Sequence, residues 1–268
     1  MTQSAPAPAA PDARPYHHGD LSRALVEAAQ RILEKDGPAA LSLRAVAREA
    51  GVSPAAPYHH FKDKGELLEA VAHEGWAALD AALTAARRIL EKDGPAALSL
   101  RAVAREAGVS PAAPYHHFKD KGELLEAVAH EGWVALDAAL TDARARAADS
   151  KERMTSLGVA YVCFARDNPA LYRVMYDCSR DKDALPEQMK EEGAYCQVRN
   201  TIAEQGGGEV SEIDLELATI AAWCAAHGLA EMIAFKQFAP LKEMLGGETA
   251  FLSAVFEHLG MFAKLDQA

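Results

Sequence analysis

The stretch GVSPAAPYHHFKDKGELLEAVAHEGW occurs twice in this chain, as residues 51–76 and again as residues 108–133. It belongs to a longer repeat, in which residues 31–84 match residues 88–141 at all 54 positions except one, Ala77 against Val134. Solenoid proteins need at least three units, so two near-identical copies indicate a tandem duplication inside an ordinary protein. A natural duplication and an assembly artefact leave the same pattern in a sequence.

Each copy has the pattern of a helix-turn-helix unit. Residues 19–37 carry one apolar helical stripe, and residues 41–51 follow as a short helix with Ser42 as its N-cap. Ser53 and Pro54 fit the N-cap and the first position of a third helix. Two short helices that meet at a glycine turn are typical of DNA-binding proteins, in which the second helix enters the major groove.

The composition favours helices and a cytoplasmic location. Half of the 268 residues are hydrophobic, and Ala, Leu and Glu are abundant. No apolar stretch approaches the roughly 18 residues of a membrane span, so no membrane partner is expected. Residues 1–15 lack the features of a signal peptide and are expected to form a disordered arm. The four cysteines show no CxxC spacing, which favours reduced thiols in a cytoplasmic protein, associated with the nucleoid when bound to DNA.

The net charge of −11 is unevenly distributed. Residues 121–268 hold 14 Lys and Arg against 24 Asp and Glu, so almost all of the negative excess lies there. Residues 1–120 are nearly neutral. A neutral half can bind DNA when its cations lie on one face, and an acidic remainder limits non-specific binding.

The sequence YHHGDLSRALVEAAQRILEKDGPAALSLRAVAREAGVSPAAPYHHFKDKGELLEAV, which begins at Tyr16, resembles the N-terminal DNA-binding domain of the tetracycline-repressor (TetR) family. The match extends to about Trp76. It implies that the third helix reads the DNA bases and that flanking residues bind the phosphate backbone. Phosphate contacts fix the register of a protein on the DNA. The implied contacts are Ser42, Arg44, Ser53, Pro54, Ala55, Ala56, Tyr58, His59 and Lys64, and in the second copy Ser99, Arg101, Ser110, Pro111, Ala112, Ala113, Tyr115, His116 and Lys121.

This third helix is poor in hydrogen-bonding side chains. Ala and Pro can meet a thymine methyl group but cannot make bidentate contacts to bases. Part of the specificity would then come from DNA shape or from the arm that carries Arg14. Adjacent histidines on a helix point apart, and no Cys or carboxylate completes a metal site, so neither a metal nor a cofactor is expected.

The second copy has to take its first helix from the end of the first copy, and residues 78–92 are predicted to play this part. Ala78 and Ala82 replace Leu21 and Leu25, a loss of roughly 2–5 kcal/mol for each leucine that is buried. Three interpretations follow. Both copies bind DNA and the first extends the footprint, or the first alone binds and the second is a spacer, or the first is a passenger.

A longer helical region follows the repeat. Asn168 and Pro169 predict one helix start, and Ser211 with Asp214 resembles a capping box at another. A further helix is predicted over residues 185–205, and an apolar helix near the end of the chain.

Trp223, His227 and Gly228 form the Trp…His-Gly signature of the ligand-binding and dimerisation domain of some TetR-family proteins, which this region resembles. The resemblance implies a homodimer in which the last two long helices pair with their copies. It also implies an apolar pocket for a small effector, although each side chain could instead belong to an ordinary core. The candidate pocket residues are Met154, Tyr161, Phe164, Tyr172, Met175, Trp223 and His227.

The sequence thus predicts an all-α chain in which a three-helix helix-turn-helix unit occurs twice in tandem, ahead of a helical effector-binding and dimerisation domain. The expected boundaries are residues 1–15 for the arm, 16–77 for the first unit, 78–144 for the second and 145–268 for the last domain.

The main hypothesis is a one-component transcriptional regulator, most simply a repressor, which binds a palindromic double-stranded DNA operator as a homodimer and is released by a small, mostly apolar effector. The alternative is a duplication variant that dimerises and binds ligand but has lost or altered DNA binding. A helical enzyme or ligand carrier is a further rival. The sequence shows no nucleophile–base pair, Gly-rich phosphate loop or metal spacing, so no catalytic residue is assigned.

Overall fold

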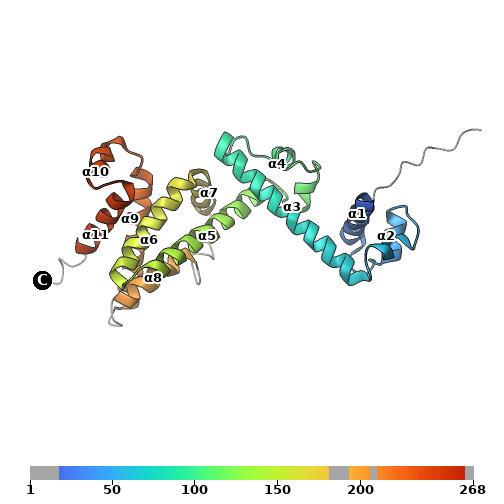
Figure 1. Ribbon diagram of the computed structural model, residues 1–268, viewed down its shortest axis with the longest axis horizontal. Helices are drawn as coiled ribbons and strands as arrows, with labels where there is room; N and C mark the ends of the chain where they lie inside the picture. The colour runs from blue at the N-terminus through green and yellow to red at the C-terminus, as the bar shows by residue number, and fades with distance from the viewer. Residues whose placement is uncertain (1–17, 181–192, 206–209, 263–268) are drawn as a thin grey trace, which may run out of the picture. The chain divides into compact units, whose positions relative to one another are not determined.

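The computed structural model describes residues 18–180, 193–205 and 210–262, and every regular element within these ranges is a helix (Figure 1). The prediction of an all-α fold is confirmed. The predicted arm lies outside the described residues, as does the first part of the helix predicted over residues 185–205. The chain divides into two compact units, residues 1–80 and 81–268, which are described in turn.

Unit 1 is a small helical domain around one apolar core. The core side chains of Leu25, Ala28, Val46 and Leu67 are fully buried. They come from three helices that pack on one another, so no single helix holds the core alone. The elements of the unit are α1 (His18–Asp36), α2 (Leu43–Glu49), the 3₁₀ helix η1 (Ala56–His59) and the first part of α3 (Lys64–Asp93).

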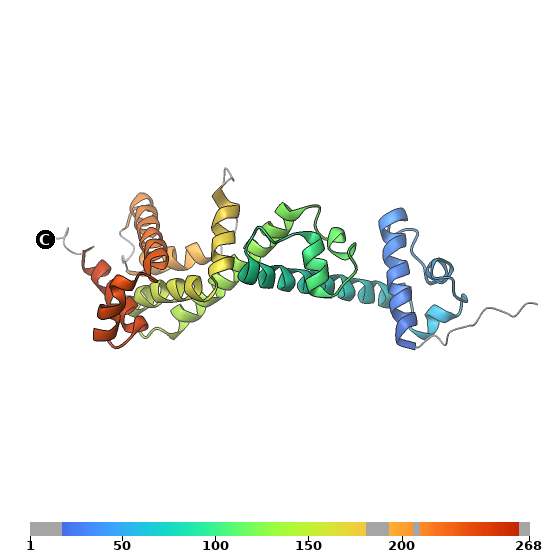
Figure 2. The same cartoon turned by 90° about the horizontal axis from the view of Figure 1, so that it is seen from above.

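Unit 2 contains the second helix-turn-helix region and a set of helices in the described residues from 121 to 262, which we call the body. The elements after α3 are α4 (Leu100–Ala107), η2 (Ala113–His116), α5 (Lys121–Arg146), α6 (Ser150–Asp167), α7 (Pro169–Arg180), α8 (Ala194–Gln205), α9 (Glu212–Met232), η4 (Lys236–Phe238), α10 (Ala239–Met244) and α11 (Glu248–Phe262). In the body, α5 packs against α6, α7 and α8, and α9 packs against α6 and α8 (Figure 2).

The short helices of the two copies have the same ends. The Ser42 Oγ atom accepts a hydrogen bond of 3.2 Å from the Ala45 N–H at the start of α2, and Ser99 caps α4 in the same way. The predicted N-cap is therefore confirmed. Gly51 and Gly108 follow these helices with φ of +69°, a left-handed conformation that glycine adopts without strain.

The predicted third helix is wrong in its start and its type. The structure has a four-residue 3₁₀ helix there, and its N-cap is Ala55, not Ser53. Pro57 lies at the beginning of this helix, where it donates no backbone hydrogen bond and disfavours the α conformation at the residue before it. The backbone bonds accordingly span three residues, from the Ala56 N–H to the Ser53 oxygen and from the Tyr58 N–H to the Ala55 oxygen. We call residues 53–60 and their copy, 110–117, the reading turns.

The second helix-turn-helix region begins with the end of α3. Ala82 and Leu83 are buried there, at the positions that Leu25 and Val26 occupy in α1. The larger Leu83 therefore replaces part of the side-chain volume that is lost with Leu25. Leu21 is only half-buried in α1, so its replacement in the second copy removes less apolar contact than full burial would imply.

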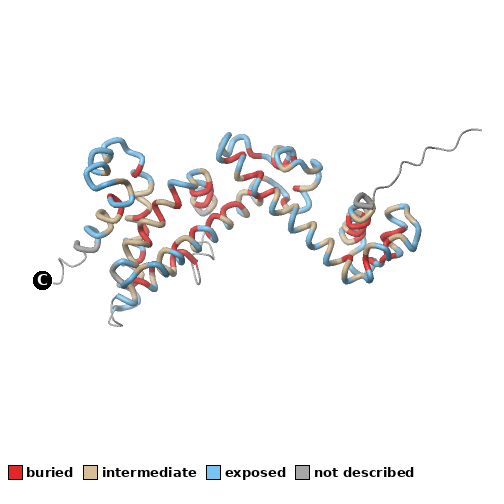
Figure 3. Tube along the Cα trace, viewed as in Figure 1, coloured by how far each residue is buried: buried red, intermediate tan, exposed pale blue. Residues whose placement is uncertain are grey.

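The helices α3 and α5 carry the same residues after the reading turns, but these residues differ in burial. Trp133, in α5, is 2% exposed, and its ring centroid lies 5.3 Å from that of Tyr176 and 6.3 Å from that of Trp223. Its counterpart Trp76, in α3, is 71% exposed. Figure 3 shows the same contrast along the two helices, with buried residues in red. One sequence thus makes an interior contact in α5 and faces water in α3.

Gly132 and Gly75, which directly precede these two tryptophans, show the same difference between crowded and open surroundings. A Cβ atom added to Gly132 would lie 2.6 Å from the Cγ and Sδ atoms of Met175 and 3.0 Å from Leu171 Cδ1. Around Gly75 nothing lies within 4 Å of such an atom. Gly132 is therefore the residue that lets α7 approach α5 closely.

We expect the same substitution to have opposite effects at these two positions. Gly132→Ala should lower the free energy of unfolding by about 1–3 kcal/mol, because the fully buried Met175 has to move to admit the new methyl group. Gly75→Ala should raise it by up to about 1 kcal/mol, because alanine favours an exposed helix over glycine. Calorimetric unfolding of the full chain measures both effects. Equal destabilisation by the two variants would contradict this assignment.

Candidate DNA interface and effector site

The candidate DNA surface of each copy lies on its reading turn. Tyr58 is 52% exposed and Tyr115 is 51% exposed, so the two copies present this ring alike. The side chains of Pro57, within the first reading turn, and Phe61, directly after it, are buried and fix this turn to the core of unit 1. The other candidates that are exposed are Ser53, Pro54, Ala55 and His59 with Ser110, Pro111, Ala112 and His116, while Ala56 and Ala113 are half-buried.

The starts of α2 and α4 offer a second set of exposed polar groups. The Ser42 oxygen accepts the Ala45 N–H, so its hydroxyl hydrogen can be donated to an acceptor outside the protein, such as a phosphate oxygen. Arg44 is exposed within the first turn of α2. Ser99 and Arg101 have the same exposure in the second copy, so these candidates lie on the surface where the prediction requires them.

Lys64 and Lys121 have a partner within the protein. The Lys64 Nζ atom donates a hydrogen bond of 2.6 Å to the Pro38 oxygen, and Lys121 donates to the Pro95 oxygen in the same way. Each lysine thereby ties the turn before α2 or α4 to the start of the next long helix. An ammonium group has three donors, so a phosphate contact stays open to both residues.

The sequence analysis missed the capping boxes that fix the starts of the long helices. The Asp63 Oδ1 atom accepts the Glu66 N–H at 3.0 Å, and Glu66 Oε2 accepts the Lys62 N–H at 2.6 Å. Asp120 and Glu123 repeat this arrangement at α5. An acidic residue followed three positions later by Glu is the signal that could have revealed them. These bonds hold the reading turn against the helix that follows it.

A cluster of phenol, indole and imidazole groups lies inside the body of unit 2. The Tyr161 hydroxyl is 3.1 Å from the Tyr172 hydroxyl and also contacts that of Tyr176. The His227 Nδ1 atom lies 2.5 Å from the Tyr172 hydroxyl and 3.3 Å from the Tyr161 hydroxyl. The Trp223 indole N–H donates to the Tyr176 hydroxyl at 3.1 Å. We call these five residues the tyrosine cluster.

Burial keeps the phenols of this cluster protonated. It raises the pKa of Tyr161 well above its ordinary value, and the neighbouring Tyr176 and Tyr172 raise it further. Burial also raises the pKa of Tyr172, and that of Tyr176 to about 12. At neutral pH each phenol can therefore donate one hydrogen bond and accept others. Neutral donors and acceptors within an aromatic wall suit a ligand that is mostly apolar with one polar group.

The structure brings four of the seven pocket candidates, Tyr161, Tyr172, Trp223 and His227, into this cluster. Met175 packs beside Gly132, as described above, and Met154 precedes Tyr161 by seven residues, about 10 Å along α6. The sequence analysis missed Tyr176. Its spacing of four from Tyr172, which places both on one face of α7, was the available signal.

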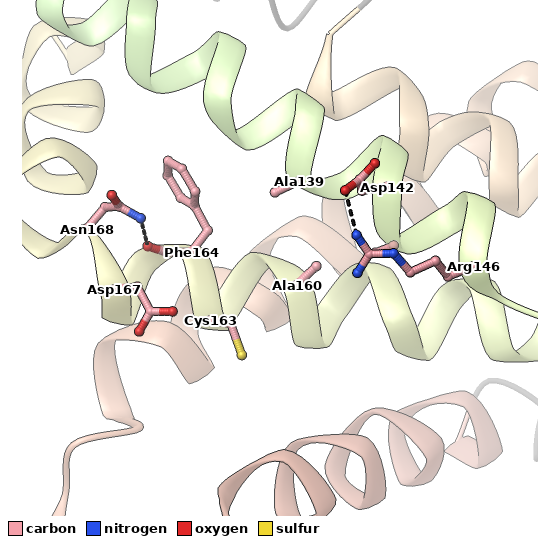
Figure 4. Close-up of a pocket in the computed structure, with 9 residues that line it drawn as sticks. Ala139, Asp142, Arg146, Ala160, Cys163, Phe164, Asp167 and Asn168 are labelled. Carbon is pink, nitrogen blue, oxygen red and sulfur yellow. Dashed lines mark hydrogen bonds and ion pairs between the residues drawn. The ribbon is translucent and has the colours of Figure 1, made fainter.

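Phe164 lines a separate groove of about 360 Å³ between α5 and α6 (Figure 4). Arg146 bridges to Asp142 at 2.6 Å along one wall, and the Asn168 side chain donates to the Phe164 oxygen at 3.0 Å on the other. The charged groups of this wall neutralise each other, and the third charged residue of the lining, Asp167, pairs with Arg166. The lining residues are Ala139, Asp142, Ala143, Arg146, Ala160, Cys163, Phe164, Asp167 and Asn168.

Residues 25–71 and residues 82–128 each match the family described as "Bacterial regulatory proteins, tetR family", and residues 154–257 match "Tetracyclin repressor-like, C-terminal domain". The chain belongs to the TetR family. It is a transcriptional regulator with helix-turn-helix DNA-binding regions, and regulators of this family are not enzymes.

Solved structures of other TetR-like chains agree with this fold. A Rhodococcus sp. RHA1 protein of unknown function is 33% identical, and the match covers 68% of this chain and 94% of that one, with a TM-score of 0.56. A tetR-family regulatory protein from Rhodococcus RHA1 is 24% identical over the same shares, with a TM-score of 0.52. The match takes in almost all of each relative and leaves about a third of this TetR chain uncovered.

Within the described residues, no single helix of this TetR protein is long and apolar enough to cross a membrane. By length and composition alone, the bent pair formed by residues 212–232 and 236–244 passes the same test together.

The phenols of the tyrosine cluster predict a loss of stability at alkaline pH. Their folded pKa values lie above the unfolded value of about 10, so the stabilisation is fully present below pH 10 and is lost as pH rises further. Urea unfolding at a series of pH values from about 8 to 11 measures this decline.

The matched control replaces Tyr161, Tyr172 and Tyr176 together by Phe, which removes the ionisable groups. The decline should then be shallower than in the unchanged protein. An identical slope in both proteins would show that other groups cause it.

Proposed function

We propose that this protein is a ligand-responsive repressor that acts in the cytoplasm, as a homodimer on a palindromic double-stranded operator, and that a small, mostly apolar effector releases it. TetR-family regulators bind DNA and typically act as dimers with small-molecule ligands, which supports this general scheme. The exposed reading turns supply the DNA contact, and the tyrosine cluster supplies the effector site. Two subunits would place their turns in successive major grooves, roughly 34–36 Å apart.

One observation carries the link between effector and DNA, namely the position of α5. This helix begins at Lys121, directly after the second reading turn, and it holds Trp133 against the tyrosine cluster. The two residues are twelve positions apart, about 18 Å along the helix. Because Trp133 is buried and packs on both Tyr176 and Trp223, a molecule bound beside either ring would displace the Trp133 ring. Because α5 is one continuous helix, such a displacement also moves the start of α5 and the reading turn attached to it.

The effector and the operator should therefore weaken each other's binding by the same factor. The operator is obtained by selection from random duplex DNA, and the effector from a screen for small aromatic molecules that raise the melting temperature of the chain. Fluorescence anisotropy of the labelled operator, with and without the effector, then gives the factor. Full release, from 99:1 to 1:99 occupancy, needs roughly a 10⁴-fold preference for the released state.

Two outcomes would contradict the proposal. If no DNA sequence is enriched, the chain is not an operator-binding repressor. If a bound compound leaves operator affinity unchanged at saturation, the tyrosine cluster does not control DNA binding. Tyr176→Phe serves as the control for the effector site, because it keeps the ring but removes the hydroxyl that accepts the Trp223 N–H.

The proposed dimer surface includes an apolar stripe on α9. Ile213 is 73% exposed and Leu217 is 60% exposed, and Ile220 is also exposed. Their spacing of four and three places them on one face of the helix. The opposite face, with Leu215 and Trp223, is buried in the body. An apolar face of this kind supports pairing of α9, together with α11, with the same helices of a second subunit.

We expect Leu217→Glu to convert the dimer to a monomer, because pairing across a two-fold axis would place the new charges in an apolar interface. Met244→Glu is the matched control, since Met244 is an exposed apolar residue of α10, outside the stripe. Sedimentation equilibrium of the two variants measures the change in mass. A dimer that survives Leu217→Glu would place the interface elsewhere.

A further inference from the structure

The two reading turns have the same surface but different connections to the body. We propose that unit 1 is a second DNA-binding site, that it prefers the same half-site sequence as the second reading turn, and that the effector does not control it. The inference rests on the proposed function, because it requires DNA as the common ligand.

The first step is the identity of the two surfaces. The residues of the reading turns are the same in both copies, and the exposed fractions of Tyr58 and Tyr115 differ by a single percentage point. The serine caps, the left-handed glycines and the lysine bonds to Pro38 and Pro95 are also repeated. Side chains of the same kind on the same backbone offer the same donors, acceptors and methyl groups to DNA. The preferred bases should therefore be the same for both turns.

The second step is that unit 1 has a core of its own. Its first helix retains Leu25, which is fully buried, whereas the second copy has Ala82 at this position. Phe61 and Leu67 close the core beneath the reading turn and the start of α3. Unit 1 therefore has a buried core of its own, and Phe61 is buried beneath its reading turn as Phe118 is beneath the second.

The third step is the different surroundings of the helices that follow the turns. In α5, Trp133 is buried against Tyr176 and Trp223, which is the contact through which the proposed function has a ligand at the tyrosine cluster act on this helix. In α3, the counterpart Trp76 is 71% exposed, and nothing lies near the place of a Cβ atom on Gly75. The contact through which the effector acts on the second turn is thus not repeated for the first.

The consequence is a regulator with two DNA contacts of one specificity per chain, and four per dimer. When one turn is bound, the second binding event becomes intramolecular wherever the spacing of half-sites permits it, which raises the overall affinity. The effector then loosens the second turn while the first continues to bind DNA. The effector therefore lowers the overall operator affinity by removing the contacts of the second turn and, with them, the intramolecular binding step.

Stoichiometry tests the first part of the proposal. The probe is a short duplex that carries one half-site from the sequence selected by the full-length protein, titrated at concentrations well above its dissociation constant and at low salt. We expect two duplexes per chain. We expect one for Tyr58→Ala/His59→Ala, one for Tyr115→Ala/His116→Ala and none for the four substitutions together. These side chains are exposed, so circular dichroism should show an unchanged helix content in each variant.

One duplex per chain for the unchanged protein, with a loss of binding in only one of the two variants, would overturn the proposal and leave the proposed function intact. Failure to enrich any DNA sequence would overturn the proposed function, and the second site with it. The two failures are therefore distinguishable.

The glycine pair tests the second part, without a known effector. Gly132→Ala displaces the Met175 side chain of α7 from its place against α5. In Tyr58→Ala/His59→Ala, which can bind only through the second reading turn, this change should alter half-site affinity by about fivefold or more. In Tyr115→Ala/His116→Ala, which can bind only through the first reading turn, the same substitution should leave half-site affinity within about twofold. Gly75→Ala is the matched control and should leave affinity unchanged in both. An equal effect of Gly132→Ala on the two turns would show that the body controls both.

Discussion

The packing of Trp133 against Tyr176 and Trp223 is the contact on which the rest of unit 2 depends. It joins the helix that supports a reading turn to α7 and α9, two of the three helices that hold the tyrosine cluster, and Gly132 makes it close by leaving room for Met175 and Leu171. Without this contact, α5 would be an ordinary connecting helix, and a ligand in the body would have no direct mechanical connection with the DNA surface. Coupling between two sites requires such an element with more than one stable arrangement.

Much of the fold follows from local sequence patterns. The serine at position 42 and the glycine at position 51 predict helix boundaries that the structure contains, because caps and left-handed glycines act within one or two turns of the backbone. The third helix was the exception. The error in its prediction also has a local cause: Ser53 and Pro54 have the residue types that begin an α-helix, but Pro57 interrupts the α pattern three residues later.

The candidate effector site was predicted less completely than the fold, and the repeat shows why. Trp76 and Trp133 follow the same 45 residues and precede eight residues of which only the first, Ala77 or Val134, differs, yet one tryptophan is exposed and the other is buried. No rule that reads only local sequence can separate them, because the difference comes from α7 and α9, which lie far along the chain. The same holds for Tyr176, which becomes part of the cluster only when α6 and α9 are placed beside α7. Four members of the cluster were identified through the family resemblance, not through periodicity.

The helix α3 completes the core of the first helix-turn-helix region and supplies the first helix of the second region. The two copies of the repeat, residues 31–84 and 88–141, have almost the same sequence. A recombination between matching positions of the copies therefore removes one 57-residue period and creates no new junction. The shortened chain has Leu25 back beneath its single reading turn and retains a tryptophan where Trp133 packs on the body. Wherever the exchange occurs within the 54-residue match, only two products arise, with Ala77 or Val134 at the one differing position. A single exchange can thus give a simpler regulator that keeps the candidate ligand site, and retention of the longer form under growth would reveal an advantage of the proposed second DNA contact.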